Sequence, residues 1–389
     1  MTIQRAPLLL VANARMPSQR AQSLQVAQCA AAYARAGAPT TLLYAKRHGT
    51  PVPASADELL DHYDVPVAAR PKVEAVACVD WIDRVPRSLQ YAPARVQELS
   101  FARAAARRVR QEPAETRVLC REIDCAYWLG ERAGVFVEVH RVPAGRKRRQ
   151  WLASVAQRAA GFVAISGGVA EDLIEAGVAE DRILVEHDGF QPERFANMPS
   201  RADARRELGL DPDGFVVVYT GGLLAWKGVD VLVDAARLLP KLHFVIAGGM
   251  DRDVERLRAY AQGLGNVRID GFQPPSRVST YLAAGDLGVV PNRSEPLISS
   301  RYTSPLKAFE AMAAKIPLIV SDLLSLRDVL GPKEAYFVEP EDPRALALGI
   351  AHLAQHDQER EALAEHLGAR AQDHTWDARA LRILDWMEE

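Results

Sequence analysis

Short apolar segments alternate with segments of helical periodicity along the whole chain. Continuous apolar runs with β-branched residues, such as FVVVYT at residues 215–220, are typical of strands covered on both faces of a sheet. The predicted strands cover residues 8–12, 40–44, 118–120, 135–139, 161–166, 183–186, 215–220, 243–247, 267–270, 287–290 and 317–320. The predicted helices cover residues 18–36, 95–112, 168–176, 229–239, 253–262, 278–284, 306–314 and 376–387. This alternation predicts an α/β fold with parallel sheets and helices on both faces of each sheet.

The alternation runs twice, and the two runs meet near residue 195. A length of 389 residues fits two domains. The segment 191–205 contains Pro192, Pro199 and many polar residues, which predicts a linker. We therefore predict two Rossmann-like domains, one over residues 1–195 and one over 196–374, with a final helix in the segment 375–389.

The charge balance argues against some partners. The chain has 48 Lys and Arg against 50 Asp and Glu, a net charge of −2, so duplex DNA is not an expected partner. Residues 84–158 nevertheless hold 16 basic and 7 acidic residues, a net charge of +9, densest in the run RKRR at 146–149. Such a stretch suits a phosphate-bearing acceptor or an anionic membrane surface. A solvated helix face explains the same charges equally well.

The cysteines and the first apolar run bear on the cellular compartment. The four cysteines form no CxxC pair, which favours reduced thiols over a disulfide framework or a zinc site. The apolar run at residues 8–12 is too short for a membrane span or a signal peptide. The sequence thus predicts a cytoplasmic protein, with peripheral contact at the inner membrane face as one interpretation of the basic stretch.

Two groups of residues follow predicted strands, at the edge where parallel sheets bind ligands. In the first, YTGGLLAWKG, Gly221 and Gly222 allow backbone N–H groups to approach a phosphate, and Lys227 adds a positive charge. The alternative is a plain strand–turn–helix connection with a surface lysine. The pattern is neither G-x-x-x-x-G-K-[ST] nor G-x-G-x-x-G, which disfavours a dinucleotide dehydrogenase.

The second group is SPLKAFEAMA at residues 304–313. Ser304 is a suitable helix N-cap and Pro305 a suitable first helical residue, so free N–H groups would face an anion. Glu310, near the same helix end, could accept hydrogen bonds from a sugar diol. Its alternative role is a simple partner of the helix dipole.

The run SPLKAFEAMAAKIPLIVSD resembles the nucleotide-sugar signature of glycosyltransferase family 4, the retaining glycosyl transferases group 1. The run YTGGLLAWKGVDVLVDA is similar to the phosphate-binding segment of the same family, and VAISGGVAEDLIEAGV, DRILVEHDGF, IDGFQ and YLAAGDLGVVPN agree with it in order. The resemblance implies a GT-B fold of two facing Rossmann-like domains. In that fold the first domain binds the acceptor, the second binds the donor, and the final helix packs back on the first.

The resemblance also implies roles for individual residues. Lys227 matches a lysine that contacts the donor diphosphate, and Glu310 matches a glutamate that binds the ribose hydroxyls. His140, in FVEVHR, resembles a histidine that reaches the donor sugar, and we expect these three residues to be the catalytic ones. The residues expected to bind the donor are Gly221, Gly222, Lys227, Gly271, Phe272, Gln273, Ser304, Pro305, Leu306, Lys307 and Glu310. The residues expected on the acceptor side are Asn13, Arg15, Ser18 and Arg20.

Two positions depart from the family pattern. Gly222 stands where an arginine is usual, and Tyr302 stands where the first glutamate of the E-x7-E motif is expected. Arg293 or Arg301, which are near in sequence, are the candidates to supply the missing charge.

The resulting prediction is a hexosyltransferase that moves a sugar from a nucleoside diphosphate to an acceptor hydroxyl, with no metal and no bound cofactor. The acceptor is expected to be a glycan, a lipid-linked molecule or a small molecule, and nucleic acid is not expected as a partner. The alternatives are a nucleotide-sugar epimerase of the same fold and a nucleotide-sugar-binding protein without catalysis.

Overall fold

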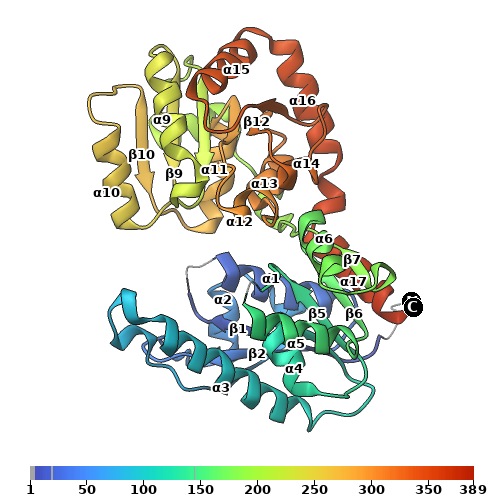
Figure 1. Cartoon of the computed structure of the whole chain (residues 1–389). Coiled ribbons are helices and arrows are strands. Elements are labelled where there is room, and N and C mark those ends of the chain that lie inside the picture. Colours follow the sequence, from blue (N-terminus) through green and yellow to red (C-terminus); the bar gives the residue numbers. More distant parts are fainter. Residues whose placement is uncertain (1–4, 19–20, 144) are drawn as a thin grey trace. The chain divides into compact units, whose positions relative to one another are not determined.

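The computed structural model of the protein describes residues 5–18, 21–143 and 145–389. The chain divides into two compact units (Figure 1). The first unit comprises Met1–His187 together with Trp376–Glu389, and the second comprises Asp188–Thr375. Within the described ranges, no helix combines the length and the apolar character needed to cross a membrane.

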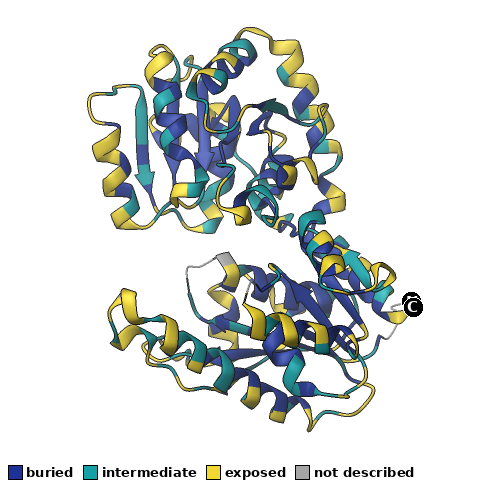
Figure 2. Ribbon diagram, in the orientation of Figure 1, coloured by how far each residue is buried: buried dark blue, intermediate teal, exposed yellow. Residues whose placement is uncertain are grey.

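The first unit is built on a sheet whose paired strands are all parallel, in the order β3-β2-β1-β4-β5-β6-β7 among the described residues. The strands are β1 (Leu8–Arg15), β2 (Thr40–Lys46), β3 (Lys72–Ala77), β4 (Arg117–Cys120), β5 (Val135–Val139), β6 (Gly161–Ala164) and β7 (Ile183–Val185). The helices are α1 (Ala21–Arg35), α2 (Ala56–Asp61), α3 (Tyr91–Val109), α4 (Ile123–Leu129), α5 (Arg146–Ala156), α6 (Gly167–Glu175) and α17 (Trp376–Glu388). Figure 2 shows the central strands buried and the outer helix faces exposed.

The second unit has a parallel sheet in the order β10-β9-β8-β11-β12-β13. Its strands are β8 (Val216–Thr220), β9 (His243–Ala247), β10 (Val267–Gly271), β11 (Leu287–Val290), β12 (Leu318–Ser321) and β13 (Tyr336–Val338). Its helices are α7 (Glu193–Ala196), α8 (Arg201–Leu208), α9 (Val229–Leu238), α10 (Asp251–Tyr260), α11 (Val278–Ala284), α12 (Leu297–Ser300), α13 (Leu306–Ala314), α14 (Leu324–Arg327), α15 (Pro343–Gln355) and α16 (Asp357–Ala369). Two parallel α/β sheets agree with the predicted fold class.

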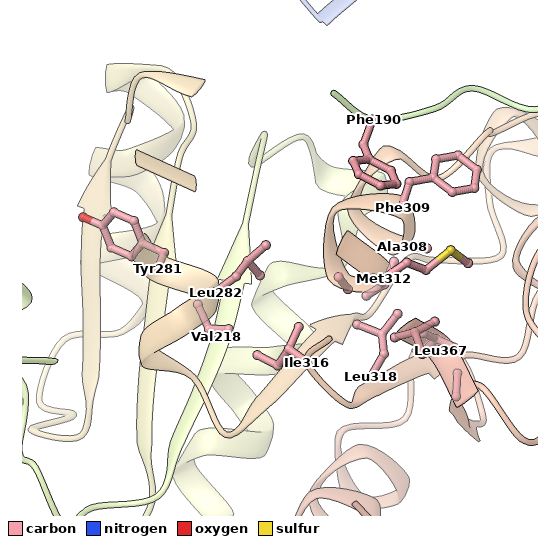
Figure 3. Packing of buried hydrophobic residues seen from close by; sticks show 14 of the residues in the cluster. Phe190, Val218, Tyr281, Leu282, Ala308, Phe309, Met312, Ile316, Leu318 and Leu367 are labelled. Atoms are coloured by element: carbon pink, nitrogen blue, oxygen red, sulfur yellow. The ribbon is translucent and has the colours of Figure 1, made fainter. Parts of the chain in front are cut away.

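Helix α13 is anchored by its apolar side. Phe309 and Met312 are fully buried and pack with Phe190, Leu318 and Leu367 in one core cluster (Figure 3). Residues three apart lie on one face of a helix, so the burial of these two side chains leaves the polar residues of α13 on other faces. The core thereby fixes where the first turn of α13 points.

Helix α17 returns the chain to the first unit and packs on α1, where Arg35 and Asp377 form an ion pair with an N–O distance of 2.5 Å. The ring centroid of Trp386 lies 5.5 Å from that of Phe136 on β5. At Gly161 a Cβ atom would lie 2.3 Å from the Trp386 ring, so the close approach of the helix requires glycine there. The last helix is thus an integral part of the first unit.

The boundary between the units lies earlier than residue 195. Asp188 donates its backbone N–H to Ser304 Oγ at 2.7 Å, and Phe190 donates to the carbonyl of His374 at 3.0 Å. Both contacts tie residues after His187 to the second unit. The predicted linker 191–205 was wrong, because it contains α7 and most of α8. The buried Arg205 of α8 pairs with Asp286 at 2.5 Å, which stabilises that helix against the second unit.

Candidate functional site

The loop after β8 requires glycine at its first position. Gly221 has a φ of +128°, a conformation that side chains rarely adopt, and its N–H donates to the carbonyl of Ala247 at 2.8 Å. A Cβ atom there would lie 2.6 Å from Lys307 Cε, so glycine also makes room for that lysine. Gly222 is exposed, and its carbonyl accepts the Tyr219 hydroxyl at 2.6 Å. The loop is therefore held open beside the start of α13.

Lys227 ends a short 3₁₀ helix, Ala225–Lys227, in the same loop. Its Nζ lies 3.7 Å from the centroid of the Trp226 ring. Gly228 follows with a φ of +63°, and a Cβ atom there would lie 1.9 Å from the Pro291 carbonyl oxygen. Burial, and then the positive charge of Lys307, lower the pKa of Lys227 well below its usual range. The ammonium groups of two lysines therefore repel each other in this part of the unit.

Lys307 stands in the first turn of α13, and its Nζ lies 4.8 Å from the centroid of the Tyr219 ring. Burial lowers the pKa of Lys307 to about 8, although the nearby Glu310 opposes the shift. Within the described part of the chain, neither Lys227 nor Lys307 has a carboxylate within ion-pair distance, and neither ammonium group has a hydrogen-bond acceptor. A bound anion would supply the missing counter-charge.

The helix start differs from the expectation. The residue before the first helical turn of α13 is Pro305, which makes no side-chain capping bond, so the prediction of Ser304 as the N-cap was wrong. The Ser304 hydroxyl accepts the Asp188 N–H instead, because the chain entering the second unit passes beside it. The N–H of Leu306 lies 3.1 Å from the Ser304 carbonyl oxygen, and the N–H of Lys307 has no acceptor among the described residues. The positive end of α13 is thus open to an anion at Lys307.

Glu310 lies on α13 one turn after Lys307 and is half-buried. Burial raises its pKa above the usual range, and the positive charges of Arg194 and Lys307 oppose that shift. No hydrogen bond to its carboxylate occurs in the described part of the chain. The carboxylate is therefore a free acceptor for hydroxyl groups beside the two lysines.

The loop after β10 holds the other predicted residues of this unit. Gly271 ends the strand with a φ of +73°, and its carbonyl accepts the Gly248 N–H at 2.6 Å. The next side chain, Phe272, is 47% exposed, and Gln273 Nε2 donates to the Asp270 carbonyl at 3.4 Å. An exposed aromatic ring at the carboxyl edge of the sheet is suited to stacking on a planar base.

The two arginines proposed to compensate for Gly222 and Tyr302 differ in their surroundings. Arg293 pairs with Asp230 at 2.5 Å, and its backbone N–H donates to the Trp226 carbonyl. Arg293 therefore lies near the lysine loop, with its charge already partnered. Arg301 directly follows α12 and is half-buried.

The predicted histidine belongs to the first unit and sits just after β5. Its side chain is 28% exposed, and His140 Nε2 lies 2.6 Å from Oε1 of Glu138. Sequence reasoning missed the glutamate, although it is a charged residue two positions away in an otherwise apolar strand. A charged side chain inside an apolar strand was therefore the sequence feature that could have identified Glu138.

The acceptor-side residues are only partly brought together. Asn13 and Arg15 line a pocket of about 410 Å³ at the carboxyl ends of β1 and β4. Ser18 is not among the lining residues, and its backbone N–H donates to the Tyr63 hydroxyl at 2.8 Å. Arg20 lies outside the described residues.

Sequence reasoning also missed Glu122, which lines the same pocket. Its carboxylate accepts the Asn13 N–H at 3.0 and 3.1 Å. Burial raises the pKa of Glu122 to about 7, against the lowering effect of Arg121. Its position directly after a buried strand, where ligand-binding residues gather, could have identified it.

The basic run 146–149 forms the start of α5. Arg146, Lys147 and Arg149 are exposed, whereas Arg148 pairs with the buried Asp124 at 2.5 Å. Three of the four charges are therefore available to solvent or to an anionic surface.

The cysteines and the possible metal ligands bear on two of the sequence predictions. All four cysteines are free, and burial raises the pKa of Cys120 and Cys125 above the usual range of a thiol. No three His, Cys, Asp or Glu side chains in the described ranges are grouped as metal ligands.

Residues 200–370 match the family model "Glycosyl transferases group 1". A D-inositol 3-phosphate glycosyltransferase from Xylanimonas cellulosilytica is 30% identical over 238 residues, which cover 58% of this chain and 55% of the relative. A putative teichuronic acid biosynthesis glycosyltransferase, TuaC of Bacillus subtilis, is 30% identical over 174 residues, covering 44% of this chain and 41% of the relative. The chain spans about half the length of the curated relatives it matches.

Solved structures match nearly the whole chain. Sucrose-phosphate synthase from Thermosynechococcus elongatus has a TM-score of 0.76 at 20% identity, covering 99% of this chain and 98% of that one. HepE from Anabaena, in complex with UDP, has a TM-score of 0.73 at 17% identity, covering 98% and 99%. Together with the two parallel sheets, these likenesses show that the fold is GT-B.

Proposed function

Because residues 200–370 match the model of the glycosyl transferases group 1, we propose that the protein is a retaining glycosyltransferase. It would move a hexose from a nucleoside diphosphate to an acceptor hydroxyl. The observation that carries the proposal is the pair of lysines, Lys227 and Lys307, which have no ion-pair partner among the described residues. They lie beside the open start of α13, near the unbonded carboxylate of Glu310.

The proposed chemistry follows from those charges. When the bond between the sugar and the diphosphate breaks, negative charge develops on the leaving phosphate. Two fixed ammonium groups and the N–H of Lys307 would stabilise that charge without reorganising. We propose that they do so without a metal ion. The Glu310 carboxylate would accept the ribose hydroxyls, and the Phe272 ring would face the base.

The acceptor is proposed to bind in the first unit, in the pocket that contains Asn13, Arg15 and Glu122. Its lining of amide, carboxylate and guanidinium groups suits a molecule rich in hydroxyl groups. Contact of the exposed residues of α5 with an anionic acceptor or an anionic membrane stays a prediction.

The function is tested with UDP and UDP-sugars, because HepE, a protein of the same fold, was solved in complex with UDP and with UDP-glucose. We expect UDP at 100 times its Kd to stabilise the protein by about 2.7 kcal/mol, seen as a rise in Tm. We further expect UDP release from a UDP-sugar to require an acceptor and to continue in EDTA. An interconverted sugar would indicate an epimerase, and binding without turnover would indicate a binding protein.

The affinity for UDP should depend on pH through Lys307. Burial lowers the pKa of Lys307 to about 8, and a diphosphate binds best to the protonated amine. UDP affinity should therefore be constant well below pH 8 and fall as the pH rises through it, by up to about tenfold per pH unit. The Lys307→Arg variant keeps its charge, so the pH dependence should become shallower between pH 7 and 9 in isothermal titrations. The dependence that remains belongs to Lys227, because burial also lowers its pKa. An equally steep fall in that variant would contradict the assignment.

A further inference from the structure

Arg379 of α17 is buried inside the first unit. Only 2% of its surface is exposed, and it is among the largest fully buried side chains of the described residues. Its Nη2 donates to Glu138 Oε2 at 2.8 Å, and its Nε donates to the carbonyl of His187 at 2.8 Å. The guanidinium thus connects the last helix to strand β5 and to the end of the first unit's main segment.

Glu138 links Arg379 to His140. The glutamate is 4% exposed, and its second oxygen, Oε1, lies 2.6 Å from His140 Nε2. Burial alone would raise the pKa of Glu138, but the charge of Arg379 and the hydrogen bond to His140 lower it well below its usual range. Glu138 is therefore an anion in close polar contact with Nε2 of the ring. Such a contact holds an imidazole ring in one orientation.

A second arginine holds the ring from the β4 side. Arg121 Nε donates to His140 Nε2 at 3.0 Å and lies 3.5 Å from Glu138 Oε1, and its Nη2 donates to Gln25 Oε1 on α1. Glu138 and Arg121 are thus charged groups in contact with the ring, and Arg379 is linked to it through Glu138. The titratable Tyr33 and Cys29 of α1 lie beside Arg379.

We propose that the C-terminal helix is a positioning element of the active site: Arg379 acts through Glu138 to hold the His140 ring in one orientation. The proposal rests on the proposed function and on the expectation, implied by the family resemblance, that His140 reaches the donor sugar. A buried ion pair adds little stability compared with apolar side chains of the same size. Its specific contribution here is a fixed geometry, since both oxygens of Glu138 are engaged, one by the helix and one by the ring.

The same helix offers a matched control. Arg382 also pairs with a glutamate of the first unit, Glu186, through N–O distances of 2.5 and 2.9 Å. Its side chain is 43% exposed, and its carboxylate partner makes no bond to His140. Arg382→Gln therefore removes an ion pair between α17 and the first unit without disturbing the pair that holds the ring.

The first test measures turnover of a UDP-sugar that the wild-type protein uses. We expect Glu138→Gln and Arg379→Lys to lower kcat about tenfold to a hundredfold, with the donor KM changed less than about twofold, since small misplacements of a reacting group have effects of this size. Arg382→Gln should stay within about twofold in both. Unchanged kcat in Glu138→Gln would overturn the proposal.

A double variant separates positioning from a general structural role. If Glu138 acts through His140, Glu138→Gln should lower kcat less than about twofold further in a His140→Ala background. A loss as large as in the wild-type background would overturn the proposal, because the glutamate would then act independently of the ring.

A measurement without turnover keeps the test independent of the proposed function. Long-range ¹H–¹⁵N spectra of the imidazole should show the same His140 ring signal in the wild type and in Arg382→Gln. In Glu138→Gln and Arg379→Lys we expect a changed ring signal, with the backbone spectrum retained. Identical ring signals in all four proteins would overturn the proposal. No turnover in any protein, with the expected ring signals, would count against the proposed function only.

Discussion

Lys227→Ala is expected to lower kcat about a hundredfold or more, with little change in the free energy of unfolding. Among the described residues the ammonium group has no carboxylate within ion-pair distance, and loss of one preorganised charge at a leaving group costs about 2.7–4 kcal/mol in the transition state. The side chain lies in a loop after β8 and stacks on Trp226, so its removal leaves the core of the second unit intact.

The matched control for this variant is Lys241→Ala. Lys241 is an exposed lysine just before β9, at the amino end of the strand and away from the proposed site. Its removal should leave kcat and KM unchanged. The measurement is steady-state release of UDP together with thermal unfolding of each variant, and normal turnover in Lys227→Ala would remove Lys227 from the mechanism.

Glu310→Ala is expected to weaken UDP binding about tenfold to a hundredfold. The carboxylate has no hydrogen bond among the described residues, and a half-buried diol without its acceptor loses about 1–3 kcal/mol. Removing a negative charge next to Lys307 would by itself favour an anion. A weaker affinity would therefore report loss of the hydroxyl contacts and not a change of charge.

Inorganic pyrophosphate provides the control ligand, because it has the two phosphates of UDP but no ribose. Isothermal titration should show that Glu310→Ala binds pyrophosphate as well as the wild type or better, whereas Lys227→Ala binds both ligands more weakly. An equal loss of affinity for UDP and pyrophosphate in Glu310→Ala would mean that the residue acts only through the end of α13.

The buried strands and the helices between them could be predicted because burial on both faces imposes continuous apolar runs. The edge strands β3 and β13 could not. β3 (KVEAVA) is mostly exposed or half-buried, and β13 has only three residues, so neither carries the pattern of a central strand. The segment 191–205 was mistaken for a linker because its prolines and charges are typical of loops. The buried pairing of Arg205 with Asp286, 81 positions later in the chain, overrides that local signal.

Local rules are enough to propose most of the candidate site in the second unit, because Gly221, Lys227, Lys307 and Glu310 follow strands or start a helix. They failed where a distant partner decides the outcome. Ser304 has the chemistry of an N-cap, but its hydroxyl accepts a hydrogen bond from Asp188, 116 positions away. Glu138 and Arg379 are 241 positions apart in the chain, and the sequence around neither residue predicts that the two form a contact.

The membership of α17 in the first unit also sets an order of events during synthesis. The ribosome makes about 190 residues of the second unit between His187 and Trp376, which takes roughly 10–40 s at about 5–20 residues per second. Through that interval the nascent first unit lacks Arg379, so the buried carboxylate of Glu138 has no cation from the last helix. The first unit to be translated is therefore the last to complete its fold, and its interior is finished only once the final helix has left the ribosomal tunnel.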